Sequence, residues 1–312
     1  MIRNMCLRAR RFHRDVRQSS QSNNAQSRSF QKIMHDKRGK NVELTLREIL
    51  SYGTVRIECT GKNNQVTAGT GYVVEFKQDE EANTGITVII TNKSVVRGAE
   101  KGKLVFTREN EEGDPDDKKQ HKVVLSQFEK KWVMHPDPAV DLCALPIDTL
   151  VLKAQAKGIE LFFTLIGMDL IPTEEQLDEL DAMEEVVTAG FPDGLWDAVN
   201  NRPILRRGVT ATHPRMDYNG KKELLIDAAA VPGTSGSPVL IIEENGYFDR
   251  DGNFHPDENR ILFLGTLSAA PHQTTDDRPE RSDVPAAASP HPPLNLGFVI
   301  KSSRILELEA LF

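Results

Sequence analysis

The most constraining feature of this sequence is a series of short apolar runs rich in β-branched residues, separated by turns rich in Gly, Asn and Asp. Three such runs are Val55–Cys59, Gly71–Phe76 and Ile86–Ile90. Asn219-Gly220 and Asn245-Gly246 lie between later apolar runs, and Asn-Gly is a strong hairpin signal because both residues tolerate positive φ. Many short strands with frequent turns predict an all-β barrel or sandwich in preference to an α/β fold.

Two segments carry helix-start signals. Thr45 and Glu48 have capping-box spacing and predict a short helix that ends near Gly53. Pro172–Gln176 supplies a second capping box before an acidic helix. The apolar positions that this helix is expected to turn toward the core are Leu177, Leu180 and Met183. A solvated outer face explains the acidity better than an acidic docking site. Residues 271–293 hold six prolines and predict a long surface loop before a strand at Leu296–Ile300.

Charge divides the chain into a basic leader and an acidic body. Residues 1–40 hold 11 Lys/Arg and 2 Asp/Glu, a net charge of +9, which leaves 28 against 44, or −16, for residues 41–312. An acidic body excludes a nucleic-acid-binding face, which needs clustered Lys and Arg. The leader suits a mitochondrial presequence, a disordered tail, or an over-long start with Met34 as the true initiator. We therefore expect the fold to occupy residues 41–312.

Cysteine usage and hydropathy bear on the compartment. Cys59 and Cys143 lie inside apolar runs and predict small buried side chains, not a disulfide set. The sequence contains no run of about 18 apolar residues, so no membrane span is predicted, and the N-terminus lacks the apolar core of a secretory signal. A cytoplasmic location follows, or the mitochondrial matrix if residues 1–33 are a presequence. We predict no cofactor and no metal, since Asp249–Asn253 departs from a calcium loop and is better explained by a hairpin turn at Asp251-Gly252.

One stretch carries a candidate nucleophile. Gly233-Thr-Ser-Gly-Ser-Pro238 places Ser235 on a glycine-flanked turn before an apolar run. Acyl transfer by serine needs the hydroxyl on a tight turn, backbone N–H groups aimed at the developing oxyanion, and a base within reach. Gly233 and Ser235 are the candidate oxyanion donors. The six-residue string alone is weak evidence for a nucleophile, because Gly/Ser turns are common in loops. The rest of the sequence strengthens that evidence.

Over residues 50–305 the chain resembles the trypsin-like serine peptidases of the chymotrypsin fold, especially the HtrA-type branch. The blocks that carry the resemblance, in chain order, are Gly69-Thr-Gly71, Ile89–Val96, Asp141–Leu145, Asp227-Ala-Ala before Ser235, and Leu296–Ile300. The order of histidine segment, aspartate and serine is that of the chymotrypsin arrangement. The resemblance implies an all-β, chymotrypsin-like double β-barrel, with barrels at about 50–150 and 185–305. Capping signals and composition add one acidic helix and a disordered N-terminal leader to this fold.

One departure from the family pattern concerns catalysis. Where the motif has Thr-Asn-x-His-Val-Val, this sequence has Thr91-Asn-Lys-Ser-Val-Val96, so Ser94 stands at the place of the catalytic histidine. A serine hydroxyl does not accept a proton at neutral pH, whereas imidazole does. Asp141 is then left without a base to orient. Three other residues are candidate substitute bases but are not favoured: His135, His272 and Lys93.

The resemblance also implies a substrate site. Its pocket floor lies near Ala229 and Ala230, where small residues favour small or medium aliphatic side chains. An extended peptide is expected to pair as an added strand with Gly265, Thr266, Leu267 and Ser268. Extended peptides or proteins are thus the expected partners, and the oligomeric state stays open. Two functions remain: an inactive or strongly impaired peptidase that binds peptides, or an active endopeptidase in which Ser94 is an inactivating variant or another base is recruited.

Overall fold

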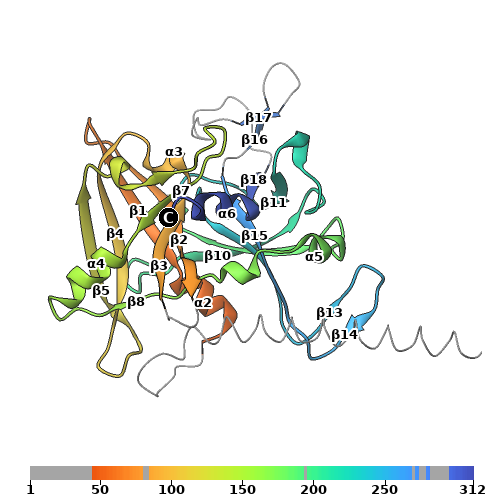
Figure 1. Ribbon diagram of the computed structural model, residues 1–312, viewed down its shortest axis with the longest axis horizontal. Coiled ribbons are helices and arrows are strands. Elements are labelled where there is room, and N and C mark those ends of the chain that lie inside the picture. The colour runs from red at the N-terminus through yellow and green to blue at the C-terminus, as the bar shows by residue number, and fades with distance from the viewer. Residues whose placement is uncertain (1–43, 80–83, 193–194, 269–270, 274–278, 282–294) are drawn as a thin grey trace, which may run out of the picture.

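A computed structural model describes residues 44–79, 84–192, 195–268, 271–273, 279–281 and 295–312, and the leader lies outside them. The first of its two β units is an eight-stranded sheet in the order β5-β4-β1-β2-β3-β7-β6, with β8 on β4 (Figure 1). Every neighbouring pair in it is antiparallel. The strands are β1 (Thr54–Gly61), β2 (Val66–Asp79), β3 (Thr84–Thr91), β4 (Ala99–Glu109), β5 (Pro115–Ser126), β6 (Val133–Met134), β7 (Cys143–Pro146) and β8 (Leu161–Phe162).

The second β unit is a closed barrel in the order β10-β11-β18-β15-β12-β9. Its strands are β9 (Glu185–Gly190), β10 (Ile204–Thr210), β11 (Glu223–Asp227), β12 (Pro238–Glu243), β15 (Arg260–Leu267) and β18 (Leu296–Lys301). Two further pairs lie outside the barrel: β13 (Tyr247–Phe248) with β14 (Phe254–His255), and β16 (Pro271–Gln273) with β17 (Pro279–Arg281). The predicted all-β class is confirmed, because strands form both units and carry the buried core.

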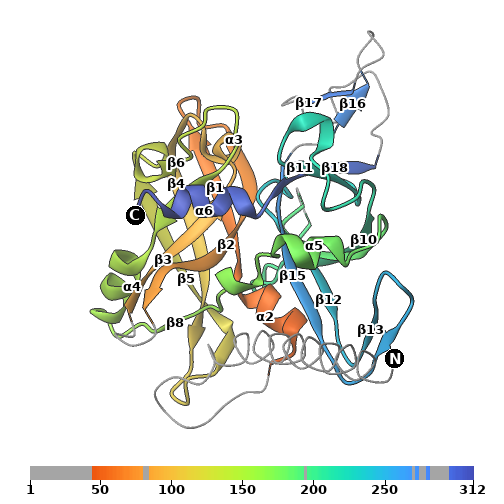
Figure 2. The ribbon, with the colours of Figure 1, turned by 45° about the vertical axis from the view of Figure 1, so that its right-hand side comes forward.

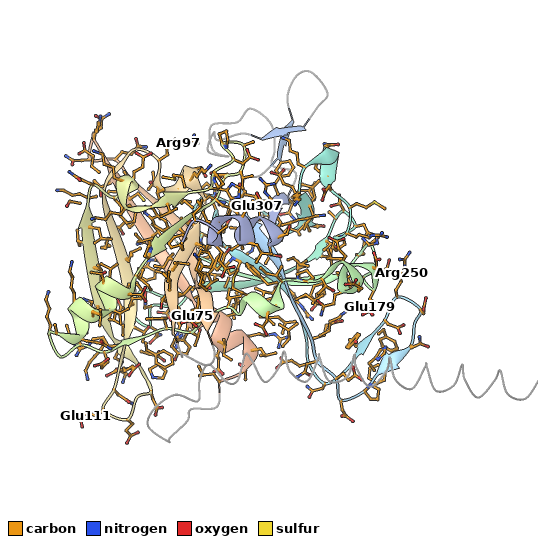
Figure 3. All side chains as sticks on the ribbon, viewed as in Figure 1. Glu75, Arg97, Glu111, Glu179, Arg250 and Glu307 are labelled. Carbon is orange, nitrogen blue, oxygen red and sulfur yellow. The ribbon has the colours of Figure 1, made fainter. Side chains whose placement is uncertain are left out.

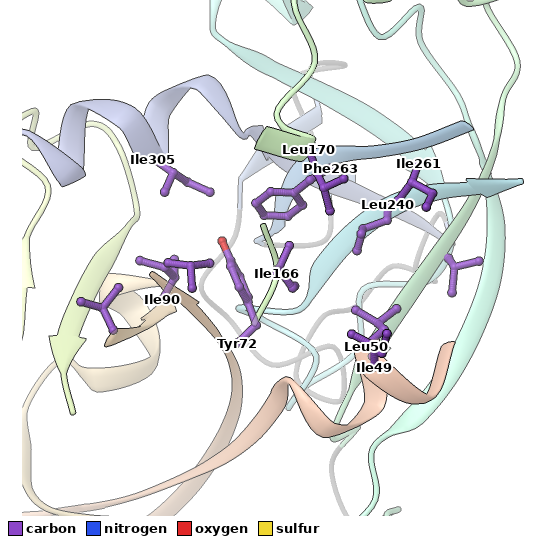
Figure 4. Close-up of a cluster of buried hydrophobic side chains, with 14 of the residues drawn as sticks. Ile49, Leu50, Tyr72, Ile90, Ile166, Leu170, Leu240, Ile261, Phe263 and Ile305 are labelled. Atoms are coloured by element: carbon purple, nitrogen blue, oxygen red, sulfur yellow. The ribbon is translucent and has the colours of Figure 1, made fainter. Parts of the chain in front are cut away.

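The two units share one apolar core, which holds them together. Tyr72 of β2 is fully buried, its ring packs edge-on against Phe263 of β15 at 5.4 Å, and its hydroxyl hydrogen-bonds Thr266 Oγ1 at 2.7 Å. Figure 4 shows this cluster, with Ile90 from the first unit and Leu240 from the barrel around the same centre. Each unit also has an apolar cluster of its own. Contacts across the shared core fix the relative position of the two units, and with it any site between them.

Short helices connect and cover these units. They are α2 (Leu46–Tyr52), α3 (Lys93–Val96), α4 (Asp148–Gln155), α5 (Glu174–Asp178) and α6 (Ser303–Glu309), with 3₁₀ turns η1 (Glu129–Lys131), η2 (Met168–Leu170) and η3 (Tyr218–Gly220). The capping boxes predicted at Thr45 and Thr173 are both formed. In Figure 2, α6 runs from the barrel back across the first unit, where Phe312 packs against Phe76.

Two local predictions need correction. The acidic helix α5 ends at Asp178, five residues before Met183, which is 70% exposed and so lies outside the core. Leu180 is fully buried as expected, although it follows the helix. Asn245 and Gly246 both have positive φ as predicted, but they do not form the turn of a hairpin. The hairpin β13–β14 turns at Asp249–Asn253, which agrees with the separate prediction of a turn at Asp251-Gly252. The local turn signals therefore gave the backbone conformation but not always the strand partner.

Candidate active site

The turn that carries Ser235 connects β11 to β12 and owes its shape to two glycines. Gly233 has φ +89° and Gly236 has φ +90°, conformations that side-chain-bearing residues rarely adopt. At Gly236 a Cβ would lie 1.9 Å from the carbonyl oxygen of Thr70. Glycine is therefore required at position 236 for both its φ and its close approach to β2, which explains the Gly-Thr-Ser-Gly string.

Thr70 of β2 fastens this turn to the first unit. Its backbone N–H donates to the Ser235 carbonyl at 2.9 Å, and its hydroxyl donates to the Gly233 carbonyl at 2.8 Å. The same hydroxyl oxygen accepts from the Phe191 N–H at 3.0 Å. Thr91 Oγ1 in turn donates to the Thr70 carbonyl at 2.6 Å. Thr70 thus holds the serine turn through its N–H and its hydroxyl, at the boundary between the two units.

The amides of the turn fall into two groups. Thr234 N–H donates to the Val231 carbonyl at 3.0 Å, Gly236 N–H to Leu267 at 2.8 Å and Ser237 N–H to Thr234 at 3.0 Å. The N–H groups of Gly233 and Ser235 have no acceptor anywhere in the part of the chain that the structure describes. Those are the two amides that the sequence predicted as oxyanion donors. The turn therefore leaves unbonded the pair of donors that acyl transfer would require.

Asp141 and Ser94 are brought together by the end of β3 and the loop before β7. Ser94 lies on α3, exposed, and its N–H and hydroxyl donate to the two carboxylate oxygens of Asp141, each at 2.8 Å. Asn92 Nδ2 donates to the Asp141 carbonyl at 2.8 Å and so joins the two segments. Ser268 Oγ donates to Asp141 Oδ2 at 3.3 Å. The carboxylate is thus satisfied by two hydroxyls and an amide.

The hydroxyl of Ser235 has a different partner. It donates to the backbone carbonyl of Ser268 at 3.0 Å and is half-buried. No side-chain acceptor bonds this hydroxyl within the described segments. Ser268 therefore contacts both halves of the site, since its hydroxyl donates to Asp141 and its carbonyl accepts from Ser235. A backbone carbonyl has no useful basicity, so this hydrogen bond orients Ser235 without activating it.

The three substitute bases can be placed as follows. Lys93 donates to the Asp137 carbonyl at 2.9 Å, and burial lowers the pKa of its ammonium. His135 is buried, accepts from the Asp137 N–H at Nδ1 (3.1 Å), and has Nε2 3.5 Å from Glu307 on α6, which Figure 3 labels. Burial, reinforced by the nearby Arg304 guanidinium, lowers the pKa of the His135 imidazole. The side chain of His272 lies outside the described residues. The contacts of Lys93 and His135 thus go to the Asp137 loop and α6, not to Ser235.

The residues predicted to bind substrate fall into two places. Ala229 and Ala230 are half-buried in the segment before the serine turn, and the Ala229 carbonyl accepts a hydrogen bond from Arg206. Gly265, Thr266 and Leu267 belong to β15 and pair with β18, and their segment also contacts the chain around β12. Leu267 uses both its N–H and its carbonyl on the serine turn. Their backbone is therefore occupied within the barrel, and the N–H of Ser268, which follows β15, still donates to the Phe298 carbonyl of β18 at 2.8 Å.

Three structural features of the site were not predicted from the sequence. Thr70 lay inside a recognised Gly-Thr-Gly block, but no local signal showed that its side chain binds the serine turn. The contact between Ser268 and Asp141 joins residues 127 positions apart. Arg206 was one basic residue among many.

Among the described residues, no group of three or more His, Cys, Asp or Glu side chains could hold a metal, and no helix is long and apolar enough to span a membrane.

Comparisons with known proteins found one matching family model and similar solved structures. A family model described as a trypsin-like peptidase domain matches residues 69–246. The HtrA-type protease AlgW, solved with a tripeptide, is similar at 15% identity and a TM-score of 0.45, over 83% of this chain and 60% of that one. The active form of the Rv3671c protease from M. tuberculosis is similar at 16% identity and a TM-score of 0.42, over 85% and 82%. The chain thus spans 60% of the length of the AlgW chain. No curated protein matches the sequence.

Proposed function

The chain belongs to the trypsin-like peptidase family, and on that premise we propose that it is a pseudopeptidase, a protein that binds extended peptides in the cleft of a chymotrypsin-like fold and hydrolyses them negligibly. The single observation that carries this proposal is the pairing of Ser94 with Asp141. The carboxylate that would orient a catalytic imidazole is bonded instead to the backbone and hydroxyl of a serine.

The missing imidazole should make hydrolysis very slow. A base must take the Ser235 proton and return it to the leaving amine, which imidazole does near neutral pH and a hydroxyl does not. In subtilisin, removing the triad histidine alone costs about a millionfold in turnover, with the remainder supplied by binding and the oxyanion hole. The hydroxyl of Ser94 donates a hydrogen bond to Asp141, and among the described residues no side chain accepts a hydrogen bond from the Ser235 hydroxyl. We expect a deficit of the same order here.

The features that support binding are those that do not depend on the base. The unbonded N–H groups of Gly233 and Ser235 suit a peptide carbonyl. A peptide that adds a strand needs free backbone groups at a strand end. The backbone of Gly265–Leu267 is paired within the barrel, and the Ser268 N–H donates to the Phe298 carbonyl at 2.8 Å. We therefore propose that an added strand begins at the Ser268 carbonyl, which accepts only the Ser235 hydroxyl among the described residues and has a second lone pair for a peptide N–H. Extended peptides or protein segments are the partners that this arrangement would accept.

A fluorophosphonate probe tests the proposal, because its reaction depends on an activated serine. The unmodified protein is expected to label slowly, whereas Ser94→His is expected to label at least about 100-fold faster, the range of general-base catalysis, and to cleave casein. Ser235→Ala in both backgrounds is the control that assigns the label to this residue. Intact mass gives the extent of labelling.

The outcomes separate the two functions that the sequence left open. Peptidase-like labelling of the unmodified protein at Ser235 would refute the pseudopeptidase and support an endopeptidase that recruits another base. A gain of labelling with Ser94→His supports a site complete except for the imidazole. If neither protein labels, the amides of the serine turn do not form an oxyanion hole, and the proposed cleft is wrong.

A further inference from the structure

Arg206 enters the barrel wall from β10, close to the segment before the serine turn. In the antiparallel pair of β9 and β10 it lies directly opposite Thr188, so the two side chains share one face of the sheet. Val186, two residues before Thr188 and so on the same face of β9, belongs to the barrel's own apolar cluster, whereas Val187 and Ala189 on the other face belong to the core shared with the first unit. The face of Thr188 is therefore the one that points into the barrel. The adjacent Arg207 points outward, where it forms an exposed ion pair with Glu185. Two neighbouring arginines therefore have opposite environments.

Arg206 is half-buried, and its guanidinium has a single hydrogen-bond acceptor among the described residues. It donates to the carbonyl of Ala229, the residue that the family resemblance assigns to the floor of the specificity pocket. No Asp or Glu forms an ion pair with Arg206 among the described residues. A guanidinium has five N–H donors in a planar fork and keeps its charge throughout the physiological range. No described residue accepts from its remaining donors, which could therefore bind an anion, and partial burial makes such an anion favourable.

Two buried hydroxyls lie on the same inner face. Thr188 Oγ1 and Ser237 Oγ each lack a hydrogen-bond partner within the described part of the chain, although their residues are only 3% and 1% exposed. Ser237 Oγ lies over Gly190, where a Cβ would be 2.2 Å away. Gly190 is two residues from Thr188 on β9 and therefore on the same face. Unsatisfied buried hydroxyls are uncommon and need an explanation.

We propose that Arg206, supported by these hydroxyls, binds the acidic side chain of a peptide held at Ser235. The proposal rests on the peptide-binding function above and names its substrate class: extended peptides with Glu or Asp at the residue that enters beside Ala229. Arginine binds a carboxylate through paired N–H donors, which gives both charge and geometry. Ala229 and Ala230 alone predicted small aliphatic side chains, but the guanidinium changes the chemistry at that floor.

Glu and Gln differ in charge but hardly in shape, so comparing peptides that carry one or the other tests the proposed contact between Arg206 and a carboxylate. Fluorescence anisotropy would compare alanine-based ten-residue peptides that carry one Glu or one Gln at successive positions. At one position the unmodified protein is expected to bind Glu at least about tenfold more tightly than Gln, the size of one charge-assisted hydrogen bond. Arg206→Gln should abolish this preference, and Arg207→Gln, the matched control on the outer face, should keep it. Equal binding of Glu and Gln, or a preference that survives Arg206→Gln, overturns the inference.

A second measurement does not depend on peptide binding. Glutarate, a free dicarboxylate of similar chemistry, would be titrated while the arginine Nε–H signals are followed by NMR, with the Arg206 signal assigned from its loss in Arg206→Gln. A saturable shift of that signal supports the acidic site even if no extended peptide binds, in which case only the peptide-binding function fails. If apolar peptides bind and glutarate leaves the Arg206 signal unmoved, only the acidic specificity fails. If neither ligand binds, both are refuted.

Discussion

Replacing Thr70 by valine tests whether one side chain holds the serine turn against the first unit. Valine keeps the shape of threonine and removes only the hydroxyl. That hydroxyl donates to the Gly233 carbonyl at 2.8 Å, and its oxygen accepts from the Phe191 N–H at 3.0 Å. Thr70 is fully buried, so water cannot replace the lost partner. The substitution therefore leaves one carbonyl and one N–H unbonded.

The size of the effect follows from those two groups. Leaving a buried polar group unsatisfied costs roughly 1–3 kcal/mol, so Thr70→Val is expected to lower the free energy of unfolding by about 2–6 kcal/mol. Thr70→Ser keeps the oxygen and loses one methyl group, which costs about 1 kcal/mol. Thr67→Val makes the same change at an exposed position of the same strand, and should stay within about 0.5 kcal/mol of the unmodified protein.

Urea unfolding followed by tryptophan fluorescence measures all three variants, and coincident circular dichroism transitions establish that unfolding is two-state. The expected order of destabilisation is Thr70→Val, then Thr70→Ser, then Thr67→Val. If Thr70→Val loses less than about 1 kcal/mol, or no more than Thr70→Ser, the hydroxyl does not fasten the turn and the coupling between the two units lies elsewhere.

Two further predictions concern buried ionisable side chains. Burial lowers the pKa of the His135 imidazole below its unfolded value of about 6.5. The stability that the neutral imidazole contributes is therefore complete above about pH 6.5 and is lost as the pH falls from there through the folded-state pKa. His135→Asn should flatten the dependence of the unfolding free energy on pH between about pH 5 and 7, and an unchanged slope would contradict this prediction. Arg260 donates to the buried Glu184 at 2.8 Å, and burial raises the pKa of that carboxyl. Arg260→Met should cost about 3–5 kcal/mol by urea unfolding at pH 7, and the deficit should shrink on acidification because protonation discharges Glu184; a pH-independent deficit would indicate lost packing alone.

The residues predicted for the site were those that lie in short contiguous strings. Ser235 and its two glycines could be recognised because a tight turn imposes local conformational demands, and both glycines do adopt positive φ. Ser94 could be located because its neighbours fit a known segment. Met183 was misplaced, since helical periodicity was extended past the point where α5 ends. Periodicity shows which side chains share a face, but not where an element stops.

The sequence by itself determined the all-β class, the turn around Ser235 and the absence of imidazole at position 94, because strand propensity, glycine conformation and side-chain chemistry are properties of the residues themselves. Only the tertiary structure decided which of two adjacent arginines faces the barrel interior and that Ser268 contacts both Asp141 and Ser235. Those facts depend on strand pairing and barrel closure, which bring together residues far apart in the chain and leave no local trace in it.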